Sequence, residues 1–153
     1  MPCYALLSDT KEPVQITADS SLYNHRQLTN IFEGHVKVDQ GNAHLTADKL
    51  VIKNNKLHKI REAVAYGGSD LAHYWSSSKE NAPLFHARAQ IMRFYPLESV
   101  IVLETQVKVN QGGNSFNGPL IIYNTSTQTI TVPNSSHGHA TIVYDPETNK
   151  IFP

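Results

Sequence analysis

Several features that define common protein classes are scarce or missing in this sequence. Its 153 residues include a single cysteine, Cys3, so an internal disulfide cannot form. Lys and Arg number 13, and Asp and Glu also number 13, which gives zero formal charge and no overall basic surface for nucleic acid. No apolar run approaches the roughly 20 residues that a membrane-spanning helix needs. These absences exclude a disulfide scaffold and a transmembrane helix, and they argue against nucleic acid as a partner.

The motifs of the best-known enzyme classes are absent too. The sequence has no G-x-S-x-G nucleophile turn, no phosphate-binding G-x-x-x-x-G-K loop and no dinucleotide-binding G-x-G-x-x-G. Among eight histidines, only His137 and His139 have the H-x-H spacing of the metal-binding jelly rolls called cupins. The acids that follow are Asp145 and Glu147, and no further histidine comes after them. We therefore expect no catalytic residue, no metal site and no cofactor.

The first residues carry no recognisable secretion signal. Residues 1–7 lack a positively charged region and a full apolar stretch. The sequence is compatible with the cytoplasm, or with an exported protein whose signal has been removed. Cys3 lies within residues 1–13, which we expect to form a tail that ends at Pro13.

What the sequence has in abundance is alternation of apolar and polar residues. The alternation is clear in residues 14–18, 32–38, 43–47, 107–109 and 129–132. A period of two residues gives a strand one apolar face and one wet face. Turns rich in Gly and Asn, such as Gln40-Gly41-Asn42, separate these segments. The best candidate helix spans residues 48–65, but Val51-Ile52 and the Asn pair after it favour strand and turn. The pattern predicts an all-β protein.

Two strand-and-turn blocks recur in the same order along the chain. Ile16-Thr17-Ala18-Asp19 is similar to Phe85-His86-Ala87-Arg88 at an offset of 69 residues (87 − 18). His35-Val36-Lys37-Val38 is similar to Gln106-Val107-Lys108-Val109 at an offset of 71 residues (107 − 36). One hairpin layer cannot bury its apolar face alone, whereas stacked layers can. The recurrence predicts a fold built from repeated β-hairpin layers.

The ordered set of motifs resembles the LptA/OstA family. The family pattern is an apolar-x-A-D opening, a G-x-V-x-V-x-Q-G hairpin and a second A-D strand. The matching segments are Ile16-Thr17-Ala18-Asp19, Gly34-His35-Val36-Lys37-Val38-Asp39-Gln40-Gly41 and Leu45-Thr46-Ala47-Asp48, and the resemblance covers roughly residues 13–145. The second copy departs at Asn117-Gly118-Pro119, and the loop at residues 76–81 is long, which affects the local register.

The resemblance implies both a fold and a function. The fold would be a twisted, partly open β-jellyroll of two antiparallel sheets over residues 14–145, with tails at 1–13 and 146–153. The function would be that of a non-enzymatic carrier in the periplasm, which binds the acyl chains of lipopolysaccharide between its sheets. Members of the family stack end to end and bridge the inner and outer membranes. The implied partners are lipopolysaccharide, further copies of the chain, and LptC-like and outer-membrane assembly proteins with the same domain.

Three sets of residues are candidates for this function. The inward strand faces would line an acyl-chain groove formed by Val14, Ile16, Ala18, Phe32, Val36, Val38, Leu45, His73, Phe94, Val102, Val107 and Phe116. His73 would touch the ligand near the groove mouth. A basic stretch would meet headgroup phosphates at the groove rim through Lys53, Lys56 and Lys59. The sheet edges that would pair head to tail in self-association contain Val14 and Ile16 at one end and Thr141 and Val143 at the other.

The residues alone leave other interpretations open. The apolar stripe also fits a dry core, the lysines fit a solvated strand face, and the tails could cover the sheet edges. A carbohydrate-binding β-sandwich would use Tyr74, Trp75 and Tyr95 as an aromatic platform. A cupin-type enzyme would need the incomplete histidine set. An LptC-like protein, or the periplasmic domain of the outer-membrane component, would share the same domain.

Overall fold

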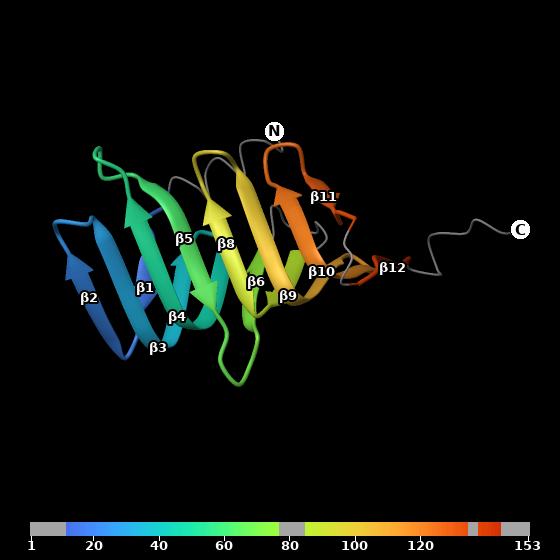
Figure 1. Ribbon diagram of the computed structural model, residues 1–153, viewed down its shortest axis with the longest axis horizontal. Coiled ribbons are helices and arrows are strands. Elements are labelled where there is room, and N and C mark those ends of the chain that lie inside the picture. The colour runs from blue at the N-terminus through green and yellow to red at the C-terminus, as the bar shows by residue number, and fades with distance from the viewer. Residues whose placement is uncertain (1–11, 77–84, 135–137, 145–153) are drawn as a thin grey trace, which may run out of the picture.

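The described part of the chain is built from strands. The computed structural model describes residues 12–76, 85–134 and 138–144, and these form twelve strands and no helix (Figure 1). None of these residues therefore belongs to a helix that could span a bilayer. The all-β prediction is confirmed, and residues 48–65 form strand and turn. The strands are β1 (Gln15–Thr17), β2 (Ser20–Asn24), β3 (Thr29–Gln40), β4 (Ala43–Asn54), β5 (Ile60–Tyr66), β6 (Ala72–Ser76), β7 (Phe85–Ala89), β8 (Ile91–Tyr95), β9 (Val100–Gln111), β10 (Asn114–Asn124), β11 (Thr129–Thr131) and β12 (Thr141–Val143).

Some features named from the sequence lie outside the described residues. They are Cys3 with most of the expected tail at 1–13, most of the loop at 76–81, His137, and the expected tail at 146–153. The described strands run from Gln15 to Val143, within the domain predicted at 14–145. The domain boundaries themselves stay predictions.

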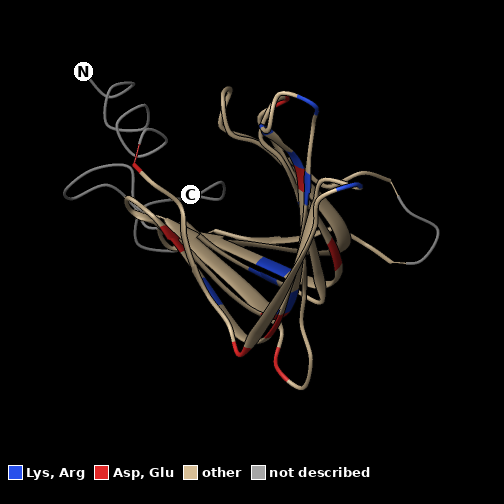
Figure 2. Ribbon diagram, turned by 90° about the vertical axis from the view of Figure 1, so that its left-hand side faces the viewer, with Lys and Arg blue, Asp and Glu red and all other residues tan. Residues whose placement is uncertain are grey.

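The twelve strands form one continuous antiparallel sheet that folds over on itself. The long strands β3, β4, β9 and β10 change partners midway along their length. One set of their halves joins β2, β5, β8 and β11 in what we call the first half-sheet. The other halves join β1, β6, β7 and β12 in the second half-sheet. Seen from the side, the two half-sheets are the arms of a V (Figure 2), as expected for a twisted, open jellyroll.

Two of the long strands, β3 and β9, bend at residues with a left-handed backbone. In β3 these are Gly34 (φ +84°) and His35 (φ +48°), where the pairing of β3 with β4 is interrupted. In β9 they are Thr105 (φ +68°) and Gln106 (φ +56°). Position 34 also requires a glycine for steric reasons, because a Cβ there would overlap the Asp19 carboxylate. Such irregularities redirect a strand without ending it, so β3 and β9 each serve both half-sheets.

The two halves of the chain repeat one six-strand unit. Ile16 pairs with Val38 between β1 and β3, and Ala87 pairs with Val109 between β7 and β9, so both partners shift by 71 residues (87 − 16 and 109 − 38). The offset of 71 is therefore confirmed, whereas the offset of 69 for the first block is wrong by two residues. Because apolar alternation has a period of two, a shift of two residues leaves the pattern almost unchanged.

The core lies between the two half-sheets. Its large, fully buried side chains include Leu50, Met92, Leu103 and Ile121, and no polar or charged residue in the described ranges is buried. Small residues alternate with large ones where the two repeats meet, which allows the half-sheets to approach closely. The buried alanines there are Ala65, Ala72, Ala87 and Ala89.

The first half of β9 alternates in the phase opposite to the predicted one. Ile101 and Leu103 are 5% and 0% exposed and belong to the core. Val102 between them is only partly buried, lies outside the core cluster, and faces the outer surface opposite Arg93 of β8. The predicted inward position of Val102 is therefore wrong. Residues 100–103 are all apolar, so the sequence contains no alternation there from which the phase could be read.

Replacing Leu103 and Val102 in turn distinguishes the two faces of β9. We expect Leu103→Ala to lower the free energy of unfolding by about 2–5 kcal/mol, because it leaves a cavity in the core. We expect Val102→Ala to lower it by less than about 1 kcal/mol, because the outer face can rehydrate. Urea unfolding followed by circular dichroism measures both. A larger loss for Val102→Ala than for Leu103→Ala would reverse the assignment of the faces.

Candidate functional site

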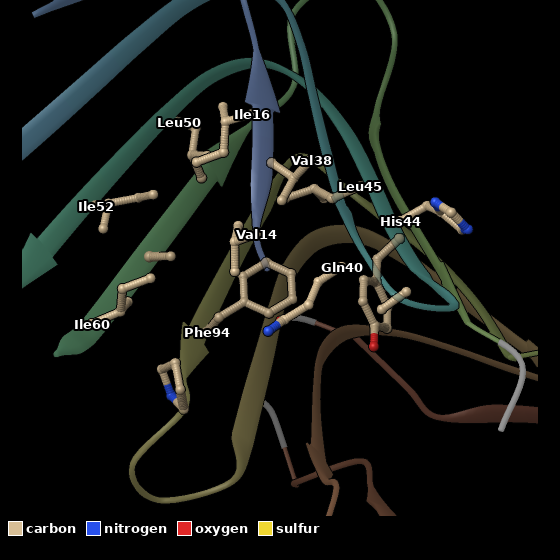
Figure 3. A pocket seen from close by; sticks show the side chains of 14 residues that line it. Val14, Ile16, Val38, Gln40, His44, Leu45, Leu50, Ile52, Ile60 and Phe94 are labelled. Carbon is tan, nitrogen blue, oxygen red and sulfur yellow. The ribbon is translucent and has the colours of Figure 1, made fainter. Parts of the chain in front are cut away.

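A groove opens between the half-sheets, among the strands of the first repeat and β8. Its volume is about 240 Å³, and Figure 3 shows the 14 side chains that line it. The lining residues are Val14, Ile16, Val38, Gln40, Ala43, His44, Leu45, Leu50, Ile52, Ile60, Ala63, Tyr74, Phe94 and Pro96.

Strand pairing sets the positions of these side chains. One row crosses the second half-sheet, each member opposite the next, and consists of Ile16, Val38, Leu45 and Tyr74. The facing row crosses the first half-sheet and consists of Ile52, Ala63 and Phe94. The strand β4 contributes to both rows because it bends between Leu45 and Ile52. The rows meet where the rings of Tyr74 and Phe94 pack edge to face, with their centroids 5.6 Å apart.

The chemistry of the groove is that of a hydrocarbon site. Its lining contains no Lys, Arg, Asp or Glu, and its polar members are Gln40, His44 and Tyr74. Of these, His44 points away from the cavity (Figure 3). The groove therefore offers no set of acid, base and nucleophile, whereas it can remove apolar ligand surface from water.

Part of the groove set predicted from the sequence lies here, namely Val14, Ile16, Val38, Leu45 and Phe94. Several lining residues were missed, mostly on the first half-sheet, namely Leu50, Ile52, Ile60 and Ala63. For two of them, Leu50 and Ile52, the sequence does contain a signal. Inward positions of β4 are odd-numbered up to residue 47 and even-numbered from Leu50 onward, and this change of phase marks the bend.

Other residues of the predicted set lie away from the groove. Val36 and Val107 are 1% and 3% exposed and belong to the dry core. Ala18, Phe32 and Phe116 pack against the edges of that core. Of these, Ala18 and Phe32 line a separate hollow that also contains Asp19 and is more polar.

His73 lies on the outer face of β6 rather than at the groove mouth. Tyr74 beside it faces the groove, and the ring of His73 instead packs 4.6 Å from that of Trp75 and 5.3 Å from that of His86. Burial against these neighbours, followed by the positive charge of Arg88 and by His86, lowers the pKa of His73 from 6.5 to about 4. The predicted place of His73 at the groove mouth is therefore wrong.

The three lysines predicted for the rim differ in their surroundings. Lys56 and Lys59 are exposed in the turn between β4 and β5, directly before the groove residue Ile60. Lys53 lies opposite Glu62, with its Nζ 3.6 Å from Oε1 of that residue, so its charge already has a partner. Within the described residues, the unpaired positive charges next to the groove are therefore those of Lys56 and Lys59 in the turn, and not that of Lys53 in β4.

Both ends of the sheet have open edges. Among the described strands, β1 and β2 pair with β3 alone, and β11 and β12 pair with β10 alone. Apolar side chains are exposed along these edges, with Leu22 at 63%, Ile142 at 41% and Val143 at 53%. An exposed edge with unpaired N–H and C=O groups is a template for a further strand.

Pairs of acids and histidines occur, but larger ligand clusters do not. Within the described ranges, no group of three or more His, Cys, Asp or Glu side chains is placed to hold a metal ion. His35 Nδ1 lies 2.7 Å from Asp19 Oδ2, and the hydrogen bond, with the charge of Asp19, raises the pKa of this exposed histidine. His44 Nδ1 lies 2.6 Å from Asp39 Oδ1.

The sequence is similar to known lipopolysaccharide export proteins. It is 29% identical over 126 residues to the lipopolysaccharide export system protein LptH of Pseudomonas aeruginosa, a match that covers 82% of this chain and 71% of LptH. It is 24% identical over 123 residues to the lipopolysaccharide export system protein LptA of Escherichia coli K12, covering 80% of this chain and 65% of LptA. The chain thus spans a little less than two thirds of the E. coli protein.

The fold is also similar to that of a solved lipopolysaccharide transport protein. The crystal structure of LptH, described as the LptA-homologous periplasmic component of the lipopolysaccharide transport device of Pseudomonas aeruginosa, superposes with a TM-score of 0.83 at 25% identity. The superposition covers 91% of this chain and 99% of that one. A family model described as LptA/(LptD N-terminal domain) LPS transport protein matches residues 15–129. The chain therefore belongs to the LptA/LptD N-terminal domain family of lipopolysaccharide transport proteins.

Proposed function

We propose that this protein is a periplasmic carrier that holds acyl chains of lipopolysaccharide in the groove between its half-sheets. The observation that carries the proposal is the groove itself, which has an apolar lining without Lys, Arg, Asp or Glu. Each exposed CH₂ of an acyl chain costs about 0.8 kcal/mol in water. A carrier that moves such chains through an aqueous compartment must therefore replace that water with apolar surface, and no catalytic group is needed.

The size of the groove bears on how much ligand it takes. A volume of about 240 Å³ lies below the roughly 300–1,000 Å³ of pockets that enclose a whole drug-sized ligand. A groove of this size encloses part of an acyl chain, and the rest must extend along the open side. Val14, at the mouth and 42% exposed, continues the apolar lining toward the β1 edge. Lys56 and Lys59 would then meet the phosphates of the headgroup at the rim.

The internal repeat supports a proposal of head-to-tail self-association. Inside the chain, the end of the first repeat pairs with the start of the second, β6 with β7 and β5 with β8. In the β6–β7 junction His73 lies opposite Arg88, and Tyr74 lies opposite Ala87. The second repeat ends in β12, and the first begins with β1, so two copies can form the same junction head to tail.

The register of that junction can be transferred from the internal one. Because β12 pairs with β10 as β6 pairs with β4, Thr141 corresponds to His73 and Ile142 to Tyr74. Because β1 pairs with β3 as β7 pairs with β9, Thr17 corresponds to Arg88 and Ile16 to Ala87. Thr141 of one copy is then opposite Thr17 of the next, and Ile142 is opposite Ile16. Head-to-tail contacts of this kind build an open filament, and LptC-like or outer-membrane proteins with the same domain would join at its ends.

The carbohydrate-binding alternative has less support. Its platform would need Tyr74, Trp75 and Tyr95 on one surface. Tyr74 faces the groove, whereas Trp75 is on the outer face between His44 and His73. The faces of the Trp75 ring are therefore partly covered by imidazoles and are not free to stack on a sugar.

A charge placed in the groove tests acyl-chain binding. We expect Phe94→Asp to weaken the binding of purified lipopolysaccharide at least tenfold, about 1.4 kcal/mol. An acyl chain in the groove would remove water from the new carboxylate, and the desolvation of an unpaired charge is unfavourable. Native mass spectrometry and fluorescence titration measure the loss. The matched control is Leu57→Asp, at a position that is 76% exposed and does not line the groove.

Circular dichroism must first establish that both variants are folded. Binding by folded Phe94→Asp that equals binding by Leu57→Asp would contradict the groove proposal. Val36→Asp is unsuitable for this test, because Val36 is 1% exposed and its replacement would unfold the core.

A disulfide tests the head-to-tail register. We expect Thr17→Cys with Thr141→Cys, in a Cys3→Ser background, to give a ladder of covalent oligomers on oxidation. Directly opposed residues in an antiparallel pair have Cα atoms about 4.5–5.5 Å apart, within the reach of a disulfide. Non-reducing gel electrophoresis separates the products. The control pairs Thr17→Cys with Ile142→Cys, which lies one residue out of register and on the other face. A ladder of equal yield from both pairs would refute this register.

A further inference from the structure

A row of aromatic rings crosses the outer face of the second half-sheet. It runs from His44 of β4 through Trp75 and His73 of β6 to His86 of β7. Successive ring centroids are 5.3, 4.6 and 5.3 Å apart. At one end of the row, His73 Nε2 lies 3.1 Å from His86 Nδ1. Of these rings only His44 also borders the groove, whereas Trp75, His73 and His86 do not line it, so the His73–His86 end of the row is separate from the site described above.

We propose that His73 and His86 chelate one late transition-metal ion, with Cu²⁺ bound most tightly and Zn²⁺ more weakly. Imidazole nitrogen is the commonest protein ligand for such ions, and the order of affinity follows from the general preference of nitrogen ligands for Cu²⁺. Water completes the coordination, since no third protein ligand joins the pair in the described residues. The inference does not depend on the proposed function of the groove.

The distance between the two nitrogen atoms suits one shared ion. Metal–imidazole bonds are about 2.05 Å long, and for nitrogen atoms 3.1 Å apart such bonds would enclose an angle of about 98°. This angle falls between the square-planar and tetrahedral values. The two rings now share a hydrogen bond, so the nitrogen that donates it must first lose its proton, which solvent can carry to the other nitrogen of the same ring. Each ring must also turn about its own side chain to direct a lone pair at the ion. Two metal–nitrogen bonds outweigh the loss of that single hydrogen bond.

The backbone holds the two histidines in place. They lie on neighbouring antiparallel strands, with His73 opposite Arg88 and Trp75 opposite His86, so the two imidazoles are diagonal neighbours on one face. The strand β6 also pairs with β4, and β7 with β9, which anchors both strands on their other sides. A chelate on paired strands needs little further ordering of the main chain.

The charge around the pair is compatible with binding. The pKa of His73 is lowered to about 4, chiefly by burial and then by Arg88 and His86, so its lone pair is free of a proton at neutral pH. The positive groups nearby are Arg88 and, opposite it on β9, Lys108, and both are exposed and able to turn toward solvent. They repel a cation and therefore limit the affinity to that of an open, two-ligand site.

The single tryptophan supplies a direct readout. Trp75 is the only tryptophan of the chain, and its ring is 4.6 Å from that of His73. Bound Cu²⁺ quenches the fluorescence of a tryptophan this close. We expect CuCl₂ to quench the untagged full chain saturably at one ion per chain, and ZnCl₂ in excess to reverse the quenching. We expect His73→Gln and His86→Gln each to weaken the binding of Cu²⁺ at least tenfold.

His44→Gln is the matched control, because His44 also stacks on Trp75 but has its Nδ1 2.6 Å from Oδ1 of Asp39 instead of facing a second histidine. It should leave the Cu²⁺ affinity within about twofold of the parent value. Circular dichroism checks each variant, and if one of the two test variants does not fold, the other still decides. Quenching that does not saturate, that survives both test variants, or that is lost in His44→Gln would overturn the proposal.

Discussion

The architecture depends on one constraint, which is that the long strands must bend and still pair with their neighbours on both sides of the bend. Gly34 and His35 in β3, and Thr105 and Gln106 in β9, take left-handed backbone angles at equivalent points. Each bend lets one strand end its pairing in one half-sheet and resume it in the other. Both arms of the V are therefore held by the same four strands, and the apolar faces meet between the arms although no disulfide or helix joins the arms in the described residues.

Much of the fold was predictable, and the errors have one physical source. Alternation identified strands wherever one face is wet, as in residues 32–38 and 43–47. It failed at Val102, where both faces of the strand carry apolar side chains. The repeat was visible, but a period of two residues cannot distinguish an offset of 69 from one of 71. Only strand pairing, which joins Ala87 to Val109, fixes the offset.

The groove residues could be predicted only where apolar and polar residues alternate regularly along a strand. Residues on strand segments with unbroken alternation, such as Ile16 and Val38, were assigned to the groove and line it. Beyond the bend in β4 the inward phase changes, and Ile52 was missed. His73 was misplaced because residues 72–75 include three aromatic rings in succession, so their pattern does not tell which ring faces inward. Tyr74 faces inward and His73 outward, which removes an imidazole from the groove and adds it to the outer row.

The strands that join the two repeats inside the chain are longer than the strands at the far end of the sheet, and this difference matters for the proposed assembly. Inside the chain, β6 and β7 form five residue pairs, and β5 and β8 form four. At the far end β11 and β12 have three residues each, and both are largely exposed. The proposed head-to-tail junction between copies would therefore have fewer backbone pairs than the junction within each copy and would bury less apolar surface. Since the net stability of a pairing grows with its length and its burial, the links between copies should open while each copy stays folded. A bridge made of such links could form and dissolve without unfolding its members, and the groove at the β1 end would be open to ligand whenever a link is open.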